Sequence, residues 1–184
     1  MTLSTTGPTT GPTTGPRVVL VGPMGAGKST VAGLLADRWG VEARDTDADI
    51  EAAEGRPISE IFVDSGEAHF RVREVAAVAE ALSTHEGVLA LGGGAVLDPA
   101  TRALLAGRPV VFLKVGLSDA VKRVGLGSAR PLLLGNVRGQ IKALLDERTP
   151  VYESVATAVV ETDGRTAAEV ADAVVAALAG VIRG

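Results

Sequence analysis

The chain of 184 residues contains no cysteine. This absence excludes a disulfide scaffold, a thiolate zinc site, an iron–sulfur cluster and a cysteine nucleophile. Aromatic residues are scarce, at three Phe, one Tyr and one Trp, which is too few for a platform that stacks nucleic-acid bases. The longest wholly apolar run, from Ala173 to Ile182, has ten residues and is too short to span a bilayer.

Charge and hydrophobicity further limit the classes of protein to which the chain can belong. The chain has 18 basic and 22 acidic residues, and a net charge of −4 disfavours electrostatic binding to nucleic acid. A hydrophobic fraction of 46% supplies a real core. Neither a basic start nor an apolar stretch precedes Arg17, so the sequence predicts no secretory signal. We therefore expect a cytoplasmic, monomeric protein with no nucleic-acid or membrane partner.

A repetitive segment stands at the amino terminus. Residues 5–16 read TTGPTTGPTTGP, with no charge and nothing apolar to bury. This composition predicts a disordered tail over residues 1–16, followed by a single domain over residues 17–184. The alternative, a short partner-binding motif, lacks any side chain that could anchor it.

Strand and helix patterns alternate from Arg17 onward. Short β-branched or apolar runs predict strands at 18–21, 42–46, 88–91, 110–115 and 156–161. Helices are predicted at 28–39, 48–54, 58–63, 67–82, 99–105, from 118, 137–147 and 166–178. This order implies an α/β protein with a parallel, five-stranded sheet between two helical layers.

The segment from Gly22 to Ser29, the phosphate loop, matches G-x-x-x-x-G-K-[ST] at every required position. A strand precedes it and a helix follows, so its N–H groups and the helix dipole form an anion site. Lys28 is placed to reach the β- and γ-phosphates, and the Ser29 hydroxyl to reach Mg²⁺. The alternative is an accidental Gly-rich turn. The motif predicts a nucleoside triphosphate and magnesium, without naming the phosphate acceptor.

Two carboxylates follow the weak second strand. Asp45 and Asp47 point in different directions if the backbone is extended, so they suit different tasks. One could hold a metal-bound water while the other accepts a proton from an attacking hydroxyl. The alternative is a helix cap, since Asp47 precedes a predicted helix.

Other candidates lie on a helix and at a strand end. Arg71 and Glu74 are three residues apart, the spacing of a solvated surface ion pair, which is the plain alternative to a functional role. Triple glycine at 92–94 indicates backbone that approaches substrate or γ-phosphate closely, or else a flexible turn. Tyr152 is expected to be a packing residue.

Two arginines remain open between two interpretations. Arg130 lies in the Gly-rich stretch 125–136, which suits a closing lid with an arginine finger or an ordinary surface loop. Arg148 follows the predicted helix 137–147, where a cation can also complement the helix dipole.

Taken in order, these segments resemble the shikimate kinase family from about Arg17 to Val181. The shared motifs are GPMGAGKST, DTD (45–47), ISEIF (58–62), GEAHFRVRE (66–74), LGGGAV (91–96), RPLL (130–133) and ERTPVY (147–152). The acceptor-side motifs belong to this family rather than to P-loop proteins in general.

The resemblance implies roles for particular residues. Asp47 would hold the ring hydroxyls of shikimate and is the candidate base, while Arg71 and Arg148 would bind its carboxylate and the Gly93 backbone would close the pocket. Asp45 would assist magnesium beside Ser29. Nucleotide contacts would come from Gly25, Ala26, Gly27, Lys28, Ser29, Thr30, Arg123, Arg130 and Arg165, with Arg130 on the lid.

The predicted reaction is ATP-dependent phosphorylation of the 3-hydroxyl of shikimate, on the route to chorismate and the aromatic amino acids. The alternative within enzymes is another small-molecule P-loop kinase, such as gluconate kinase. A GTPase-like switch would need N-K-x-D or T-K-x-D on a late strand, and Lys114 is followed instead by Val115 and Gly116.

Overall fold

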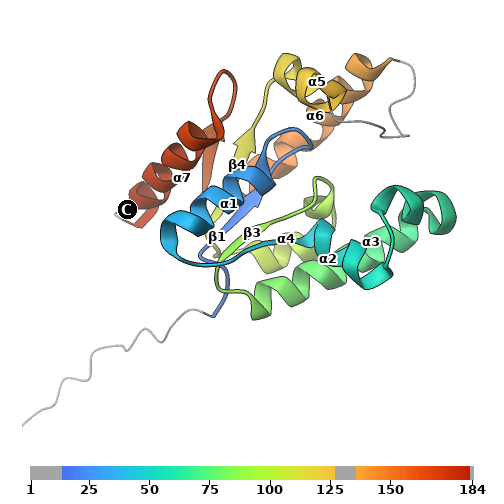
Figure 1. Cartoon of the computed structure of the whole chain (residues 1–184), viewed down its shortest axis with the longest axis horizontal. Helices are drawn as coiled ribbons and strands as arrows, with labels where there is room; N and C mark the ends of the chain where they lie inside the picture. The colour runs from blue at the N-terminus through green and yellow to red at the C-terminus, as the bar shows by residue number, and fades with distance from the viewer. Residues whose placement is uncertain (1–13, 127–135, 183–184) are drawn as a thin grey trace, which may run out of the picture.

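The computed structural model describes residues 14–126 and 136–182 (Figure 1). The strands are β1 (Val18–Val21), β2 (Ala43–Asp45), β3 (Val88–Ala90), β4 (Val110–Lys114) and β5 (Ala158–Glu161). The α-helices are α1 (Lys28–Trp39), α2 (Thr46–Glu54), α3 (Ile58–Thr84), α4 (Pro99–Leu105), α5 (Leu117–Leu126), α6 (Val137–Val155) and α7 (Ala167–Ile182), and a short 3-10 helix, η1, covers Ala95–Leu97.

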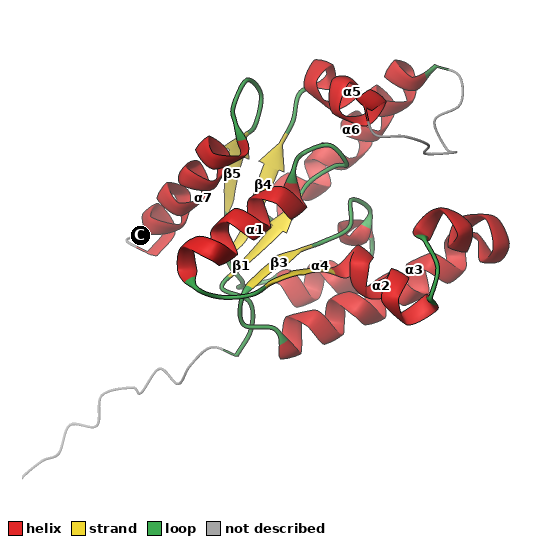
Figure 2. Ribbon diagram, viewed as in Figure 1, coloured by secondary structure: helices red, strands yellow, loops and turns green. Residues whose placement is uncertain are grey.

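The five strands form one parallel sheet in the order β2-β3-β1-β4-β5. Its centre is β1, where Val19 pairs with Leu89 of β3 and with Val110 of β4. Helices cover both faces, as the ribbon view shows (Figure 2). This confirms the three-layer α/β/α architecture predicted from the alternating pattern.

The period of two along each strand divides the core between the two faces of the sheet. Val18 and Leu20 pack with α1 and α7 on one face. Val19 and Val21 pack with the end of α3 and with Tyr152 of α6 on the other. Because β1 is buried on both faces, its apolar residues are continuous, as parallel strands require.

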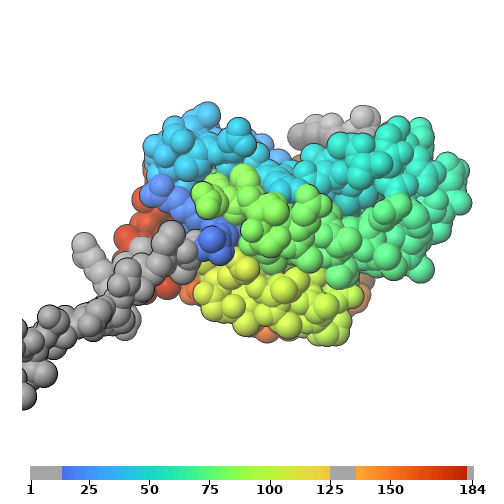
Figure 3. All heavy atoms as spheres, turned by 90° about the horizontal axis from the view of Figure 1, so that it is seen from below, coloured from blue at the N-terminus to red at the C-terminus, as the bar shows by residue number. Residues whose placement is uncertain are grey.

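A smaller core joins α2 to α3, with residues from both sides of Gly66. Ile50, Ile61 and Phe70 are buried against one another there. Gly66, at φ 83° and ψ 167°, interrupts α3 and separates the two helices predicted at 58–63 and 67–82. Helices α2 and α3 together form a lobe, drawn cyan to green, beside the yellow α4 in the space-filling view (Figure 3).

Helix α6 is longer than the sequence predicts. It continues through Pro150 to Val155, so Arg148 lies inside the helix, and its predicted place after the helix end is wrong. A proline inside a helix removes one backbone hydrogen bond and disfavours the conformation. Burial of Tyr152 in the sheet core holds the last turns in place despite that cost.

Part of the predicted tail is described. Pro16 is buried, and a Cβ on Gly15 would lie 2.3 Å from Nη1 of Arg108. Residues 1–13 lie outside the described residues, so the disorder expected for them stays a prediction. Over residues 14–126 and 136–182, we find no helix with the length and apolar character needed to cross a membrane.

Candidate active site

The phosphate loop lies between the end of β1 and the start of α1. Gly25 at φ 80° and Gly27 at φ 86° adopt left-handed backbone conformations that favour glycine. Gly27 caps α1, so Lys28, Ser29 and Thr30 form the first turn of that helix. The positive end of the helix dipole and the N–H groups of the first turn therefore face an anion site.

Lys28 lies folded over this loop. Its Nζ donates to the carbonyl oxygens of Gly22 at 2.7 Å and Pro23 at 3.0 Å. Ala26 is buried, and its N–H donates to the same Pro23 carbonyl at 3.2 Å. The ammonium group is thus held at the anion site that the loop encloses.

Asp45 links the phosphate loop to α2. One of its carboxylate oxygens accepts a hydrogen bond from the Ser29 hydroxyl at 2.5 Å, and the other accepts one from the Asp47 N–H at 2.9 Å. Asp45, not Asp47, is therefore the residue that caps α2. The cap weighed for this dipeptide therefore exists, and Asp45 is the residue that makes it.

Asp47 faces the glycine stretch at the end of β3. A Cβ on Gly92 would lie 2.4 Å from Oδ1 of Asp47 and 3.0 Å from Oε2 of Glu74. The Gly92 N–H donates to the Thr46 hydroxyl at 3.2 Å, which ties this stretch to the start of α2. Glycine at position 92 is thus needed because two carboxylates occupy the space of a side chain.

Arg71 packs on the same stretch two residues further. A Cβ on Gly94 would lie 2.3 Å from Nη1 of Arg71, so the guanidinium rests against the backbone. Nη1 donates to Glu74 at 2.7 Å, and Nη2 donates to Glu67 at 3.1 Å. Charged side chains of the protein itself therefore lie close to Gly92 and Gly94, and the approach of substrate or γ-phosphate stays a prediction.

The Arg71–Glu74 pair forms, but it is not the solvated surface pair that its spacing suggested. The Glu74 side chain is only 4% exposed, and that of Arg71 is 28% exposed. Burial raises the pKa of Glu74, while Arg71 and Arg148 oppose that rise. We call Asp47, Arg71, Glu74 and Arg148, gathered around Gly92–Gly94, the acceptor cluster, after the role that the sequence predicts for three of them.

Alanine substitutions at the two ends of the glycine stretch should change different kinetic constants. Gly92→Ala displaces Asp47 and is expected to lower kcat, by about 100-fold for a shift of about 1 Å. Gly94→Ala displaces Arg71 and is expected to raise KM for the acceptor. Each change is read in steady-state kinetics with both substrates varied.

The matched control is Gly33→Ala in α1, where nothing lies within 4 Å of the added Cβ. It should leave both constants unchanged and stabilise the helix by about 0.5–1 kcal/mol. Equal kinetic effects of all three substitutions would show that the glycines do not position the acceptor cluster.

Tyr152 and Arg148 lie four residues apart on α6 and share one face of it. The Tyr152 hydroxyl donates to the Gly93 carbonyl, and its ring stacks on Phe112 with 4.9 Å between centroids. A Cβ on Gly93 would lie 3.5 Å from the Met24 backbone nitrogen and 3.8 Å from Nη1 of Arg148. Gly93 therefore lies where the phosphate loop and the acceptor cluster meet.

Sequence reasoning treated Tyr152 as packing alone and missed this contact. The ring does pack, but the hydroxyl fixes a backbone group of the site. The four-residue spacing from Arg148 would have indicated a shared helix face once the helix was known to continue.

The buried phenol provides a direct check of this arrangement. Burial raises the pKa of Tyr152 from 10.0 to about 12, although Arg148 opposes the rise. Because the folded state holds the proton more tightly, this stabilisation is complete below about pH 10 and is lost as the pH rises through about 12. Tyr152 is the only tyrosine, so tyrosinate absorbance reports on it alone.

We expect the folded protein to show little tyrosinate below pH 11, whereas the urea-unfolded chain should titrate near pH 10. A folded protein that titrates near pH 10 would contradict the burial of this hydroxyl.

Arg123 of α5 also contacts the phosphate loop. Its Nη1 donates to the Gly25 carbonyl at 2.9 Å and to the Thr162 hydroxyl at 3.4 Å. Arg165 follows in the exposed loop after β5, and its N–H donates to the Thr162 carbonyl at 3.2 Å. The structure thus brings Arg123 and the loop of Arg165 together beside the phosphate loop. Arg130 lies outside the described residues.

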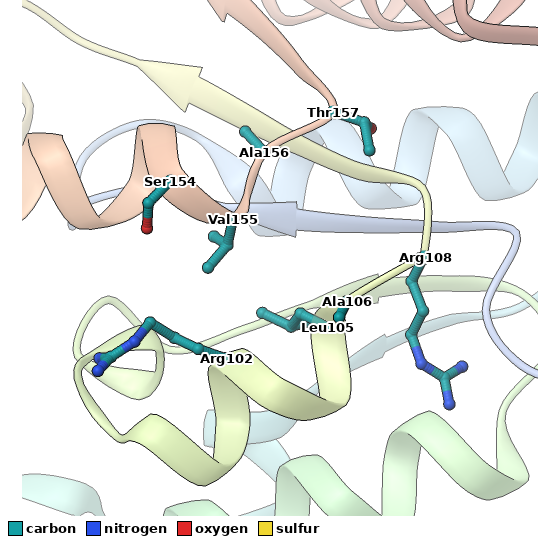
Figure 4. A pocket seen from close by; sticks show the side chains of 9 residues that line it. Arg102, Leu105, Ala106, Arg108, Ser154, Val155, Ala156 and Thr157 are labelled. Carbon is teal, nitrogen blue, oxygen red and sulfur yellow. The ribbon is translucent and has the colours of Figure 1, made fainter.

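A hollow at the amino ends of the strands, opposite the phosphate loop, has a different lining (Figure 4). It lies before the starts of β4 and β5, between the ends of α4 and α6. Arg102 and Arg108 line the hollow, but both donate to backbone carbonyls. Arg102 donates to those of Val96 and Leu97, and Arg108 donates to that of Leu104. Its arginines therefore serve the local fold, and the chemistry is concentrated at the phosphate loop.

A parallel sheet with β1 running into a phosphate loop, and an acceptor cluster beside it, defines a P-loop kinase. The shikimate kinase family model matches residues 24–179. The chain is 62% identical over 156 residues to shikimate kinase of Streptomyces coelicolor, covering 85% of this chain and 91% of that one. It is 61% identical over 161 residues to that of Salinispora arenicola, covering 88% and 96%.

The chain belongs to the shikimate kinase family, and it is an ATP-using kinase of the shikimate pathway. Its fold matches that of shikimate kinase from Acinetobacter baumannii in complex with shikimate, with a TM-score of 0.85, 36% identity and coverage of 91% and 94%. A gluconokinase from Sinorhizobium meliloti has a TM-score of 0.57 at 22% identity, covering 91% and 94%, which shows a shared fold alone.

Proposed function

We propose that the chain transfers the γ-phosphoryl group of ATP to the 3-hydroxyl of shikimate, giving shikimate 3-phosphate and ADP. The observation that carries this proposal is the acceptor cluster, where two guanidiniums and the Asp47 carboxylate surround a glycine stretch that touches the phosphate loop. The shikimate bound to the Acinetobacter baumannii relative supports the same acceptor.

The acceptor cluster suits a small acid that carries several hydroxyls. Arg71 and Arg148 bind the carboxylate of the acceptor, because guanidinium groups pair with carboxylates through two parallel hydrogen bonds. The backbone at Gly93 closes the pocket. Asp47 accepts hydrogen bonds from the ring hydroxyls and takes the proton of the attacking one.

The donor side holds ATP through residues 25–30 of the phosphate loop and the first turn of α1. Lys28 neutralises charge on the β- and γ-phosphates. Arg123 and Arg165 flank the adenine, and Arg130 contributes from the lid to the charge of the transferring group. Alignment of the hydroxyl with the phosphorus atom supplies the rest of the rate enhancement.

Magnesium fits the oxygens next to the phosphate loop. The Ser29 hydroxyl and the Asp45 carboxylate lie 2.5 Å apart, and both are hard oxygen groups of the kind that this ion prefers. Ser29 would hold the ion directly and Asp45 would hold its water. When bound, the ion neutralises charge on the phosphates.

The paired arginines disfavour the alternative of gluconate kinase. The likeness of the chain to the gluconokinase also extends to the fold alone. We propose further that the protein is a cytoplasmic monomer that acts on a small molecule and binds neither nucleic acid nor membrane.

Truncation of Arg71 tests the acceptor assignment. Arg71→Ala should weaken acceptor binding by about 2–5 kcal/mol and leave the Kd for ATP unchanged, because a charge-assisted contact to a carboxylate is lost. The measurement is the KM for shikimate beside the Kd for a nucleotide analogue.

Arg73→Ala is the control, because Arg73 lies two residues away on α3 but pairs with Glu54 at 2.8 Å. Equal weakening of both ligands by Arg71→Ala would make Arg71 a structural partner of Glu74 only.

A further inference from the structure

Glu74 is the one member of the acceptor cluster for which the proposed reaction has no task. Two glutamates contact the same arginine of α3, and they differ in burial. Glu67 accepts from Arg71 at 3.1 Å with its side chain 66% exposed. Glu74 accepts from Arg71 at 2.7 Å with its side chain 4% exposed. An exposed partner is screened by water and exchanges easily for a ligand, whereas a buried one is a fixed part of the site.

We propose that Glu74 is a specificity-determining residue, which restricts the anionic group of the acceptor to a single negative charge. The proposal rests on the proposed function, in which Arg71 and Arg148 bind that group. The two guanidiniums carry two positive charges, and the fixed carboxylate of Glu74 cancels one of them.

A monocarboxylate then completes the charge balance between these groups. It takes the hydrogen-bonding place on Arg71 that Glu67 vacates, while Glu74 stays. A dianion such as a phosphonate would leave one negative charge without a counter-charge in a partly buried site, which is costly. Asp47 meets Glu74 around Gly92 and adds to the repulsion of a second negative charge.

Charged and titratable groups from several elements face Glu74. They are Arg71 of α3, Asp47 of α2, Asp98 before α4, and Arg148 and Tyr152 of α6. Burial and Asp98 raise the pKa of Glu74, and the two arginines oppose them. The two probes are therefore compared at one fixed pH, so that the ionisation of this carboxylate is the same for both.

The test compares two probes that carry the same phenyl ring and are similar in size. Benzoate is the monoanion, and phenylphosphonate is the dianion. Each is measured as a competitive inhibitor against shikimate, in the full chain with saturating ATP. The readout is the ratio of the two inhibition constants, so that a general weakening of the pocket cancels.

The wild type is expected to favour benzoate. In Glu74→Gln the ratio should move toward phenylphosphonate by about tenfold or more, since one uncompensated charge is removed. Glu67→Gln is the matched control, because Glu67 contacts the same arginine with a solvent-exposed side chain. The ratio of inhibition constants for this variant should equal that of the wild type. The same ratio in all three proteins, or an equal shift in both variants, overturns the proposal.

A second measurement needs no variant, and it tests the restriction to a single negative charge even if Glu74→Gln does not fold. Inhibition of the wild type by phenylphosphonate is followed across the second ionisation of the probe, with benzoate in parallel. Inhibition relative to benzoate should weaken as the dianion forms. A dianion that inhibits as well as the monoanion overturns the proposal.

Failure of the proposed function has a separate signature in these assays. If shikimate supports no ADP release, the acceptor assignment itself is wrong. If shikimate is phosphorylated and the inhibition ratios do not move, only the role of Glu74 is wrong.

Discussion

Asp47→Asn is expected to fold, to bind ATP and to lose nearly all phosphoryl transfer. Asparagine keeps the size of the side chain but does not accept a proton as a carboxylate does, and general-base assistance is worth about 100- to 10,000-fold. Asp45 caps α2, so the change at position 47 leaves the start of that helix intact. Since Asp47 also orients the ring hydroxyls in our proposal, positioning losses add to the effect. Single-turnover rates measure the loss.

Asp45→Asn is the matched comparison, because it stands two residues away and carries the same chemical change. Asparagine retains a carbonyl oxygen for the cap, so the main effect should fall on magnesium, and excess Mg²⁺ should partly restore activity. Rescue of Asp47→Asn but not Asp45→Asn would mean that the two roles are reversed. A loss below about tenfold in both variants would place the base elsewhere.

Lys28→Ala is expected to lower kcat by about 100- to 1,000-fold, as removal of one preorganised electrostatic group does in other enzymes. The Lys28 ammonium donates to the loop carbonyls of Gly22 and Pro23, and the buried core clusters on the two faces of the sheet are built from other residues. The melting temperature should therefore stay near that of the wild type. Steady-state kinetics and a thermal melt on the same sample give both values.

Lys142→Ala provides the control for charge removal. Lys142 lies on the exposed side of α6 and pairs with Asp146 four residues on, so its loss should leave kcat unchanged. Near-normal turnover by Lys28→Ala would contradict the role of the phosphate loop.

The features predicted well from the sequence are those fixed by local patterns. The continuous apolar run at 18–21 gave a central strand, because a strand buried on both faces needs no polar alternation. The phosphate loop followed from glycines and Lys28 at set spacings between a strand and a helix. Helix α4 was predicted with its observed bounds, and the structure shows that Asp98 caps it and that Pro99 starts it.

The features that were missed depend on tertiary contacts. Arg71 and Glu74 have the spacing of a surface pair, and only the packing of α3 against the glycine stretch buries Glu74. The sequence pattern predicted a helix end at Glu147, yet burial of Tyr152 carries α6 past Pro150 to Val155. No local pattern reports which backbone carbonyl a tyrosine hydroxyl will reach fifty-nine residues away.

The central claim, phosphorylation of shikimate, is tested most directly by ADP release from the purified chain with ATP and Mg²⁺. Shikimate, gluconate and nucleoside monophosphates are supplied in turn, with an acceptor-free reaction as the background. We expect ADP release with shikimate and background rates with the others. Release with gluconate or a nucleoside monophosphate, and none with shikimate, would contradict it.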